Sequence, residues 1–314
     1  MLLTVMTIAL TSRPALPLIV AALVVSAGQA AGPPATPWVV AHRGASAYAP
    51  ENTVPAFVLA AEQGATFVEI DLQRSRDGAL VCLHDLTLER TTDVEEVFPD
   101  RGRQVTARGQ VRRQWPLADF TLAEIRRLDA GRWLDERFAG TRIPTFAETI
   151  AAVRGRTGLY IELKAPDRYP GIEAEMLREL RAAGLDAPWA DPETPIVVQS
   201  FTVSSLEILA RELKSPLPLH LLFGPADAAR WTSPEGLAAA RAFVTGLSPD
   251  KQVLAGDPTL VARARERGLL VTPYTYRATA VAAGFGDVGA EMRAALAAGV
   301  DGVITDNPDK AGEK

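Results

Sequence analysis

Features that stabilise small proteins or bind nucleic acids are scarce in this chain. It has one cysteine, Cys82, among 314 residues, so a disulfide within the chain is excluded. The formal net charge is −5, which excludes the strongly basic composition typical of nucleic-acid-binding domains. The sequence also contains no internal repeat and no low-complexity tract. We therefore expect a globular protein with a large apolar core and no nucleic acid partner.

The first thirty residues have the order of a secretory signal. Arg13 precedes an apolar stretch, 16–25, and small or polar residues follow it. This order predicts a signal peptide over 1–30, cleaved near Ala30, and a periplasmic or secreted protein without stable membrane insertion. An uncleaved membrane anchor is the alternative. Residues 31–37 then form a Gly/Pro-rich linker.

Strand-like and helix-like runs alternate over the rest of the chain, 38–314. Alternation of this kind predicts a parallel sheet with crossover helices, and about eight units in roughly 275 residues fit a closed (β/α)8 TIM barrel. An open doubly wound α/β sheet is the alternative. The strand-like runs are 38–41, 66–72, 80–84, 158–163, 195–199, 217–223, 242–247, 269–274 and 302–305. The helix-like runs are 53–63, 122–128, 146–153, 172–183, 203–213, 258–267 and 288–298.

One segment interrupts this alternation. Residues 85–120 are rich in charged and turn-forming residues and follow the end of a predicted strand. Barrel enzymes carry functional loops at such positions, so we predict a small insertion over the active-site face. A solvated loop without function is the alternative.

Acidic residues lie within two of the predicted strands. The period of two puts Glu69 and Asp71 on one side of their strand, and Glu162 on the same side as Lys164. Clustered carboxylates repel one another unless a cation lies between them, and oxygen-only ligands favour Ca²⁺ or Mg²⁺ over Zn²⁺. Salt bridges to Arg43 and Lys164 alone are the alternative.

Two of the three histidines also end predicted strands. His42 ends the first strand, and His84 ends the run 80–84. Two histidines at neighbouring strand ends, beside a carboxylate cluster, indicate an acid–base pair. The third, His220, lies on an apolar strand, where we expect a packed and hydrogen-bonded ring.

Basic and aromatic residues complete the predicted site. Arg43 offers a planar fork and Lys164 a point charge, both suited to a phosphate. Phe201 and Tyr274 lie at strand ends and are expected to line the wall of the pocket.

The motifs around these residues resemble those of the glycerophosphodiester phosphodiesterase family. The segment 42–53, HRGASAYAPENT, resembles the opening motif of the family. Glu69-Ile-Asp71, Leu83-His-Asp85 and Glu162-Leu-Lys164 resemble its next three motifs. Further matches are 199–201, 271–275 and 302–306, so the resemblance covers roughly 38–311. The segments 91–94, 98–101 and 273–275 look most like the periplasmic branch of the family.

This resemblance implies a metal-dependent hydrolase on a TIM barrel. Glu69, Asp71 and Glu162 would bind a divalent cation, often Ca²⁺ in the periplasmic branch. The reaction would convert a small glycerophosphodiester to sn-glycerol 3-phosphate and an alcohol. His42 would be the general base and His84 the general acid. The alternatives are a lysophospholipase D or sphingomyelinase-like phosphodiesterase, or an exported glycerophosphodiester-binding protein without catalysis.

Overall fold

The structure, a computed structural model, describes residues 36–107 and 109–312. The predicted signal peptide, 1–30, and most of the predicted linker therefore lie outside the described residues. None of the described helices combines the length and the apolar composition needed to span a bilayer.

Eight parallel strands form a closed barrel, in the order β10-β9-β8-β7-β6-β2-β1-β11. The two ends of this order, β10 and β11 with their flanking residues, are joined by the hydrogen bonds Asp301 N to Val271 O, 2.8 Å, and Tyr276 N to Ile304 O, 2.9 Å. The predicted TIM barrel is therefore confirmed, and the open doubly wound sheet is excluded. The strands are β1 (Trp38–Ala41), β2 (Phe67–Arg74), β6 (Gly158–Leu163), β7 (Ile196–Ser200), β8 (Leu219–Phe223), β9 (Gly246–Pro249), β10 (Leu270–Val271) and β11 (Gly302–Thr305).

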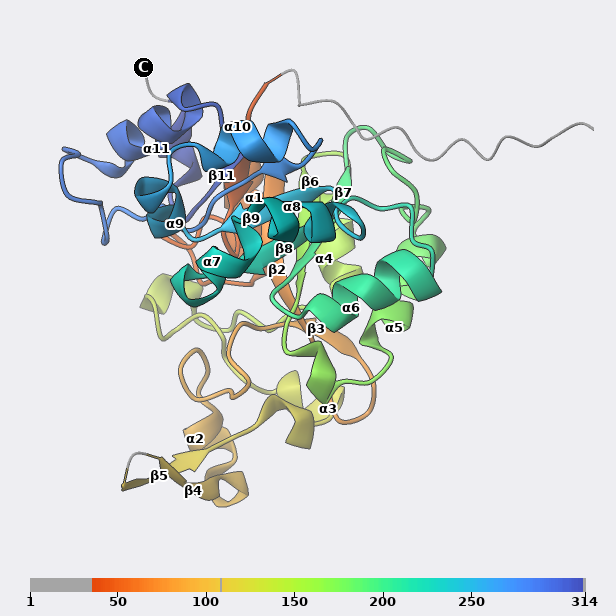
Figure 1. The fold of residues 1–314 in the computed structure, drawn as a ribbon. Helices are drawn as coiled ribbons and strands as arrows, with labels where there is room; N and C mark the ends of the chain where they lie inside the picture. The colour runs from red at the N-terminus through yellow and green to blue at the C-terminus, as the bar shows by residue number, and fades with distance from the viewer. Residues whose placement is uncertain (1–35, 108, 313–314) are drawn as a thin grey trace, which may run out of the picture.

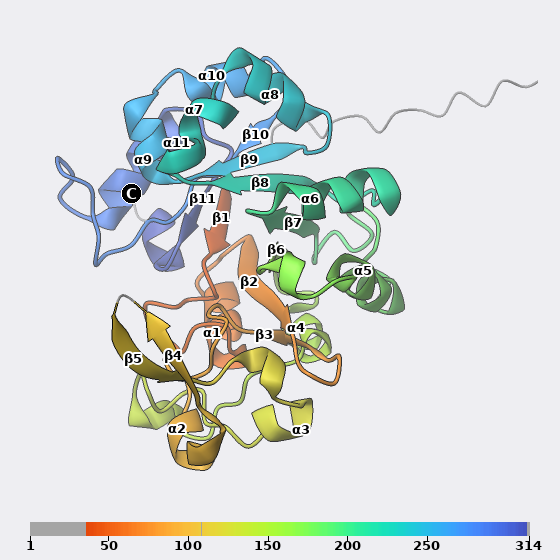
Figure 2. The same cartoon turned by 60° about the horizontal axis from the view of Figure 1, so that its bottom comes forward.

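Helices surround the barrel and bury its outward-facing side chains (Figures 1 and 2). Residues such as Val68, Ile70 and Leu72 alternate outward along β2 and are fully buried against these helices. The helices are α1 (Val54–Glu62), α4 (Phe146–Val153), α5 (Ile172–Ala182), α6 (Val203–Glu207, followed by a π-helical turn, Ile208–Glu212), α7 (Ala228–Trp231), α8 (Pro234–Arg241), α9 (Lys251–Gly256), α10 (Leu260–Arg265) and α11 (Val288–Ala297).

The amino-terminal half of the barrel interior is closed by large side chains, among them Trp38, Phe67 and Tyr160. His220 is fully buried within this layer, with Nδ1 2.6 Å from the Tyr160 hydroxyl. Burial lowers the pKa of His220 to about 3, so the ring is neutral. The prediction of a packed, hydrogen-bonded ring is confirmed, and any ligand must enter from the other end of the barrel.

Between β2 and α4 the chain leaves the barrel in a long excursion, which we call the insertion (residues 83–145). Figure 1 shows it projecting to one side of the barrel. It contains α2 (Val94–Val97), the antiparallel pair β4 (Arg103–Ala107) and β5 (Gln110–Gln114), and α3 (Leu122–Ile125). The apolar core on which these elements pack is Val81, Leu83, Leu88, Val94, Trp115, Leu117, Phe120, Ile125, Leu128, Ala130 and Ile143. The insertion therefore has a core of its own.

The prediction that the run 80–84 forms a strand of the barrel was wrong. The strand β3 (Leu80–Cys82) turns back on β2 and pairs with it antiparallel, Leu72 opposite Cys82. Gly78 has a φ of +93° in the tight turn between the two strands. His84 therefore reaches the mouth of the barrel from the loop after this hairpin, not from a barrel strand.

Two further expectations differ from the structure. The run 242–247 was predicted as a strand, but α8 ends at Arg241 and the strand β9 begins only at Gly246. We also expected Glu173, in the helix-like run 172–183, to face solvent. The Glu173 side chain is instead buried and accepts a 2.6 Å hydrogen bond from Ser205.

Candidate active site

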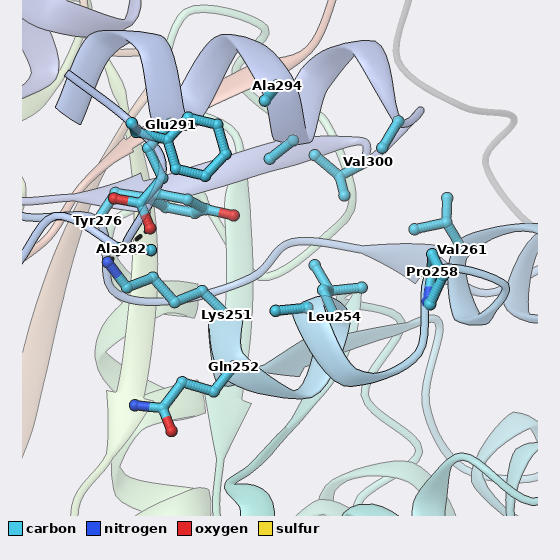
Figure 3. Close-up of a pocket in the computed structure, with 14 residues that line it drawn as sticks. Lys251, Gln252, Leu254, Pro258, Val261, Tyr276, Ala282, Glu291, Ala294 and Val300 are labelled. Atoms are coloured by element: carbon cyan, nitrogen blue, oxygen red, sulfur yellow. Dashed lines mark ion pairs between the residues drawn. The ribbon is translucent and has the colours of Figure 1, made fainter. Parts of the chain in front are cut away.

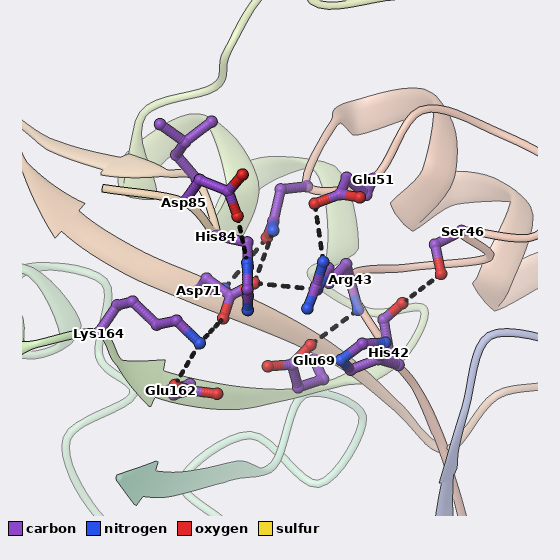
Figure 4. A network of polar contacts seen from close by, with 12 residues as sticks. His42, Arg43, Ser46, Glu51, Glu69, Asp71, His84, Asp85, Glu162 and Lys164 are labelled. Carbon is purple, nitrogen blue, oxygen red and sulfur yellow. Dashed lines mark hydrogen bonds and ion pairs between the residues drawn. The ribbon is translucent and has the colours of Figure 1, made fainter. Parts of the chain in front are cut away.

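Three carboxylates meet inside the mouth of the barrel (Figure 4). Glu69 and Asp71 extend from β2, and Glu162 from β6, where it is in register with Asp71. The three residues are 1%, 1% and 6% exposed, and one oxygen of each lies within 4.8 Å of the others. The period-two reading of both strands thus places all three acids on the inner side, where together they could hold a metal ion.

The charges of these acids are poorly balanced without a cation. Burial, together with the charges of Asp71 and Glu162, raises the pKa of Glu69 well above its usual range. Burial also raises the pKa of Glu162. For Asp71, burial is outweighed by Lys164 and Arg43, which hold its pKa below the usual range. Three hard oxygen donors with this excess of negative charge fit a divalent cation such as Ca²⁺ or Mg²⁺.

Two basic side chains contact the same acids. Lys164 Nζ lies 2.8 Å from Glu162 Oε1 and 3.3 Å from Asp71 Oδ1. Arg43 Nε lies 3.4 Å from Asp71 Oδ2, and the Arg43 backbone N–H donates to Glu69 Oε2 over 2.7 Å. The predicted salt bridges therefore exist, beside the three carboxylates that could hold a metal ion.

The loop after β1 is shaped to bring Arg43 onto the acids. Arg43 has a φ of +57° and Gly44 a φ of +80°, so the chain turns sharply there. A Cβ at Gly44 would lie 2.7 Å from the backbone of Ala56, so only glycine fits this close approach to α1. Asn52, in the same loop, makes two hydrogen bonds with Asp71. The Asn52 Nδ2 donates to Asp71 Oδ2 over 2.8 Å, and the Asp71 backbone N–H donates to Asn52 Oδ1 over 3.1 Å.

Each of the two predicted catalytic histidines is held by a carboxylate. His42 Nδ1 donates to Asp306 Oδ1 over 2.6 Å, and His84 Nδ1 donates to Asp85 Oδ1 over 2.6 Å. In both rings this leaves Nε2 to exchange a proton with a ligand. Burial and the charge of Arg43 lower the pKa of His42, although Asp306 opposes them.

These groups meet at a cavity of about 210 Å³. Every predicted site residue except Asp71 lines it, and Asp71 lies behind Lys164 and Arg43. Phe201 and Tyr274 form one wall, with ring centroids 5.8 Å apart and edge to face. The cavity is large enough for a small polar molecule such as a glycerol phosphate.

Comparison with known proteins identifies the family of this chain. The sequence model of the "Glycerophosphoryl diester phosphodiesterase family" matches residues 42–310. The chain belongs to this family. The Bacillus subtilis glycerophosphodiester phosphodiesterase is 33% identical over 278 residues, which cover 86% of this chain and 83% of the relative. The enzyme of the same name from Caldanaerobacter subterraneus is 34% identical, covering 86% and 94%. As a member, the chain is a phosphoric diester hydrolase.

Solved structures of the family share the fold. A phosphodiesterase of Oleispira antarctica, in complex with the product sn-glycerol-3-phosphate, is 27% identical with a TM-score of 0.68 and covers 88% of this chain and 95% of its own. The glycerophosphodiester phosphodiesterase of Agrobacterium tumefaciens is 28% identical with a TM-score of 0.64, covering 88% and 98%.

Several residues of this phosphodiesterase site were not singled out from the sequence. Asp306 and Asp85 hold the histidines, and Asn52 holds Asp71. All three stand inside the recognised motifs, so the motifs contain the signal although no role follows from position alone. Gln199 is 2% exposed and lines the cavity, and its Oε1 has no hydrogen-bond partner among the described residues.

Proposed function

We propose that this phosphodiesterase hydrolyses glycerophosphodiesters to sn-glycerol 3-phosphate and an alcohol, using a divalent cation and two histidines. The observation that carries the proposal is the meeting of three buried carboxylates and two carboxylate-held histidines on one cavity. The Oleispira antarctica relative, solved with sn-glycerol-3-phosphate, supports the same product here.

Glu69, Asp71 and Glu162 are the proposed ligands of the cation. When bound, it supplies positive charge that polarises the phosphoryl oxygens and offsets charge developing in the transition state. Ca²⁺ is the proposed ion and Mg²⁺ the alternative, because Ca²⁺ tolerates irregular oxygen geometry whereas Mg²⁺ requires a near-ideal octahedron.

Arg43 and Lys164 are the proposed phosphate-binding residues. Both line the cavity and both contact Asp71. Once the acids have a cation as partner, the guanidinium and the ammonium can turn to the phosphate oxygens. Phe201 and Tyr274 would enclose the glycerol or the alcohol against the opposite wall.

His42 is the proposed general base, because its lowered pKa keeps the ring neutral at neutral pH. Nε2 takes a proton from the glycerol 2-hydroxyl, whose oxygen attacks phosphorus, or from an attacking water. His84 is the proposed general acid: its Nε2 gives a proton to the leaving alcohol oxygen, while Asp85 accepts from Nδ1 and fixes the orientation of the ring. The bond from phosphorus to the alcohol oxygen breaks as the alcohol leaves. Where water attacks, this gives sn-glycerol 3-phosphate directly. Where the 2-hydroxyl attacks, it gives a cyclic phosphate of glycerol, which a water deprotonated by the now neutral His84 opens while His42 returns its proton to the 2-oxygen.

A lipid-cleaving phosphodiesterase would need an apolar trough beside the carboxylates. The apolar groove in Figure 3 has a volume of about 250 Å³ and is lined by residues such as Leu254, Val261 and Val300. It lies between α9, α10 and α11 and shares no lining residue with the catalytic cavity. This separation favours a small diester over a lysophospholipid or sphingomyelin.

We also propose that the enzyme is exported and belongs to the periplasmic branch of the family. The proposal rests on the order of residues in 1–30 and on the motifs at 91–94 and 98–101. Export is compatible with the choice of Ca²⁺, which is more plentiful outside the cytoplasm.

Turnover of glycerophosphocholine, with and without chelator, tests the function. Activity should vanish with chelator and return with Ca²⁺ at least as well as with Mg²⁺. Calorimetry should show weaker Ca²⁺ binding for Glu69→Gln than for the control Glu266→Gln, an exposed residue at the end of α10. Undiminished activity in metal-free protein would remove the cation from the mechanism.

The same assay separates the alternatives. Turnover of lysophosphatidylcholine but not of glycerophosphocholine would favour the lipid-cleaving enzymes. Binding of glycerophosphocholine without turnover, in the presence of either metal, would identify a binding protein.

A further inference from the structure

Arg90 connects two parts of the site that come from different sequence motifs. It lies in the insertion, and its guanidinium contacts two carboxylates at once. Nε and Nη2 donate to Asp85 Oδ2 and Oδ1 over 2.5 and 3.2 Å. Nη1 and Nη2 donate to Glu51 Oε2 and Oε1 over 2.9 and 2.7 Å. Arg90 is thus bidentate to both acids, a geometry that a planar guanidinium favours.

Each of these acids holds a residue of the cavity wall. Asp85 Oδ1 accepts from His84 Nδ1 over 2.6 Å, and Glu51 Oε1 accepts from Arg43 Nη1 over 2.9 Å. Figure 4 shows these two pairs side by side at the mouth of the barrel. A continuous chain of hydrogen bonds therefore runs from His84 to Arg43 through Arg90, which is itself absent from the cavity wall.

We propose that Arg90 is a positioning residue that fixes the leaving-group histidine relative to the phosphate-binding arginine. The inference rests on the proposed function, and it assigns the insertion a part in the reaction. Without the guanidinium, Asp85 and Glu51 would repel each other, and the Asp85 carboxylate would be free to rotate away from His84. The His84 ring would then lose its fixed orientation and its Nδ1–H tautomer.

A bland alternative is that Arg90 only tethers the insertion to the barrel. Its side chain is 42% exposed, so these ion pairs contribute little to overall stability. A tether would change the turnover of every substrate by the same factor. A positioning residue for the general acid should instead affect substrates according to how much their leaving group needs a proton.

Arg90→Gln and Arg90→Lys, assayed on two glycerophosphodiesters, test the proposal. In Arg90→Gln, kcat/KM relative to the wild type should fall about tenfold further for glycerophosphocholine than for the p-nitrophenyl diester of glycerol phosphate. The nitrophenolate leaving group departs without a proton. Arg90→Lys should retain little more activity than Arg90→Gln, because an ammonium cannot form bidentate hydrogen bonds with two carboxylates. The control is Arg76→Gln, since Arg76 is also exposed and pairs with Glu124 of the insertion across 3.4 Å. It should leave both rates unchanged.

A second measurement does not depend on activity. The chain has three histidines, so ¹⁵N-histidine NMR spectra can be assigned by substitution. In spectra recorded at a pH high enough for the ring to be neutral, His84 should keep its remaining proton on Nδ1 in the wild type and populate both tautomers in Arg90→Gln. Equal losses on both substrates, or an unchanged tautomer in Arg90→Gln, would overturn the proposal. Failure of the wild type to hydrolyse either diester would instead count against the proposed function, and the spectra would still decide the role of Arg90.

Discussion

His42 and His84 share one local arrangement but lie in different surroundings. Each ring donates a hydrogen bond through Nδ1 to an aspartate over 2.6 Å. The His42 side chain is 13% exposed and lies beside Arg43, whereas that of His84 is 30% exposed. A buried ring next to a positive charge is suited to stay neutral and accept a proton, and a more open ring paired with Asp85 is suited to give one.

Substitution of either histidine should therefore have a distinct effect. His42→Ala and His84→Ala should each lower glycerophosphocholine turnover by at least about 10²-fold, the usual contribution of a positioned acid or base. With the p-nitrophenyl diester, His84→Ala should recover much of its activity and His42→Ala should not. Steady-state kinetics on both substrates makes the comparison, and equal recovery in the two variants would contradict the assignment of acid and base.

At this scale the sequence predicted which residues gather at the mouth of the barrel better than which residues orient them. Glu69, Asp71 and Glu162 follow from strand periodicity and from the motifs. Asp306 pairs with His42 across 264 positions of sequence, and such a pairing leaves no local pattern. Only closure of the barrel between β11 and β1 brings the two together.

At the scale of elements, the β2–β3 hairpin carries His84 to the site. Gln73 on β2 is fully buried and donates through Nε2 to the carbonyls of Leu83 and Asp85, at 2.6 and 2.8 Å. The Tyr169 hydroxyl, in the loop between β6 and α5, donates to Gln73 Oε1 over 2.9 Å. The Gln73 amide thus helps to hold the loop that presents His84, and the Tyr169 hydroxyl holds that amide in place.

Tyr169→Phe removes only this hydroxyl and should loosen the loop. The buried Gln73 oxygen would lose its donor, so we expect the free energy of unfolding to fall by about 1–3 kcal/mol. Gln73→Met should cost more, because the loop carbonyls would lose their donor as well. Urea denaturation measures both changes. A Tyr169→Phe variant as stable as the wild type would mean that another donor replaces the hydroxyl.

Elements with strong local signals were predicted and those without were not. Helix α4 begins at a capping box in which Thr145 and Glu148 bond each other's backbone, and its predicted bounds agree with the structure. The run 80–84 is apolar but short, and a short apolar run does not specify whether a strand pairs parallel or antiparallel. Pairing of β3 with β2 is decided by the tight turn at Gly78, which the periodicity does not register.

At the scale of the molecule, the barrel interior is divided into a polar mouth and a packed base. In the base, Trp38 packs edge-on against Phe67, with centroids 5.0 Å apart, and Phe67 packs likewise against Tyr160, at 5.7 Å. A Cβ at Gly246 would lie 2.4 Å from the His220 ring, so β9 can pass this layer only as glycine. The base therefore supports the carboxylates above it and allows no passage through the barrel.

This dense base should make the whole fold sensitive to acid through His220. Its folded pKa is lowered to about 3 by burial, against an ordinary value of 6.5 in the unfolded chain. Below pH 6.5 the unfolded state binds a proton at His220 that the folded state does not bind. The contribution of neutral His220 to the free energy of unfolding is therefore complete above pH 6.5 and is lost as the pH falls. Between about pH 6.5 and 3, this group alone should lower the free energy of unfolding by about 1.4 kcal/mol per pH unit.

His220→Asn separates this effect from the other titrating groups. Asparagine can still bond the Tyr160 hydroxyl but takes up no proton, and its smaller volume leaves a gap beside Gly246. The variant should therefore be less stable than the wild type at pH 8 and lose less stability on acidification. Urea denaturation of both proteins at pH 8, 6 and 4.5, with chelator present throughout, gives the two slopes. Parallel slopes would show that His220 takes up its proton without unfolding the barrel, and the acid sensitivity would then belong to other groups.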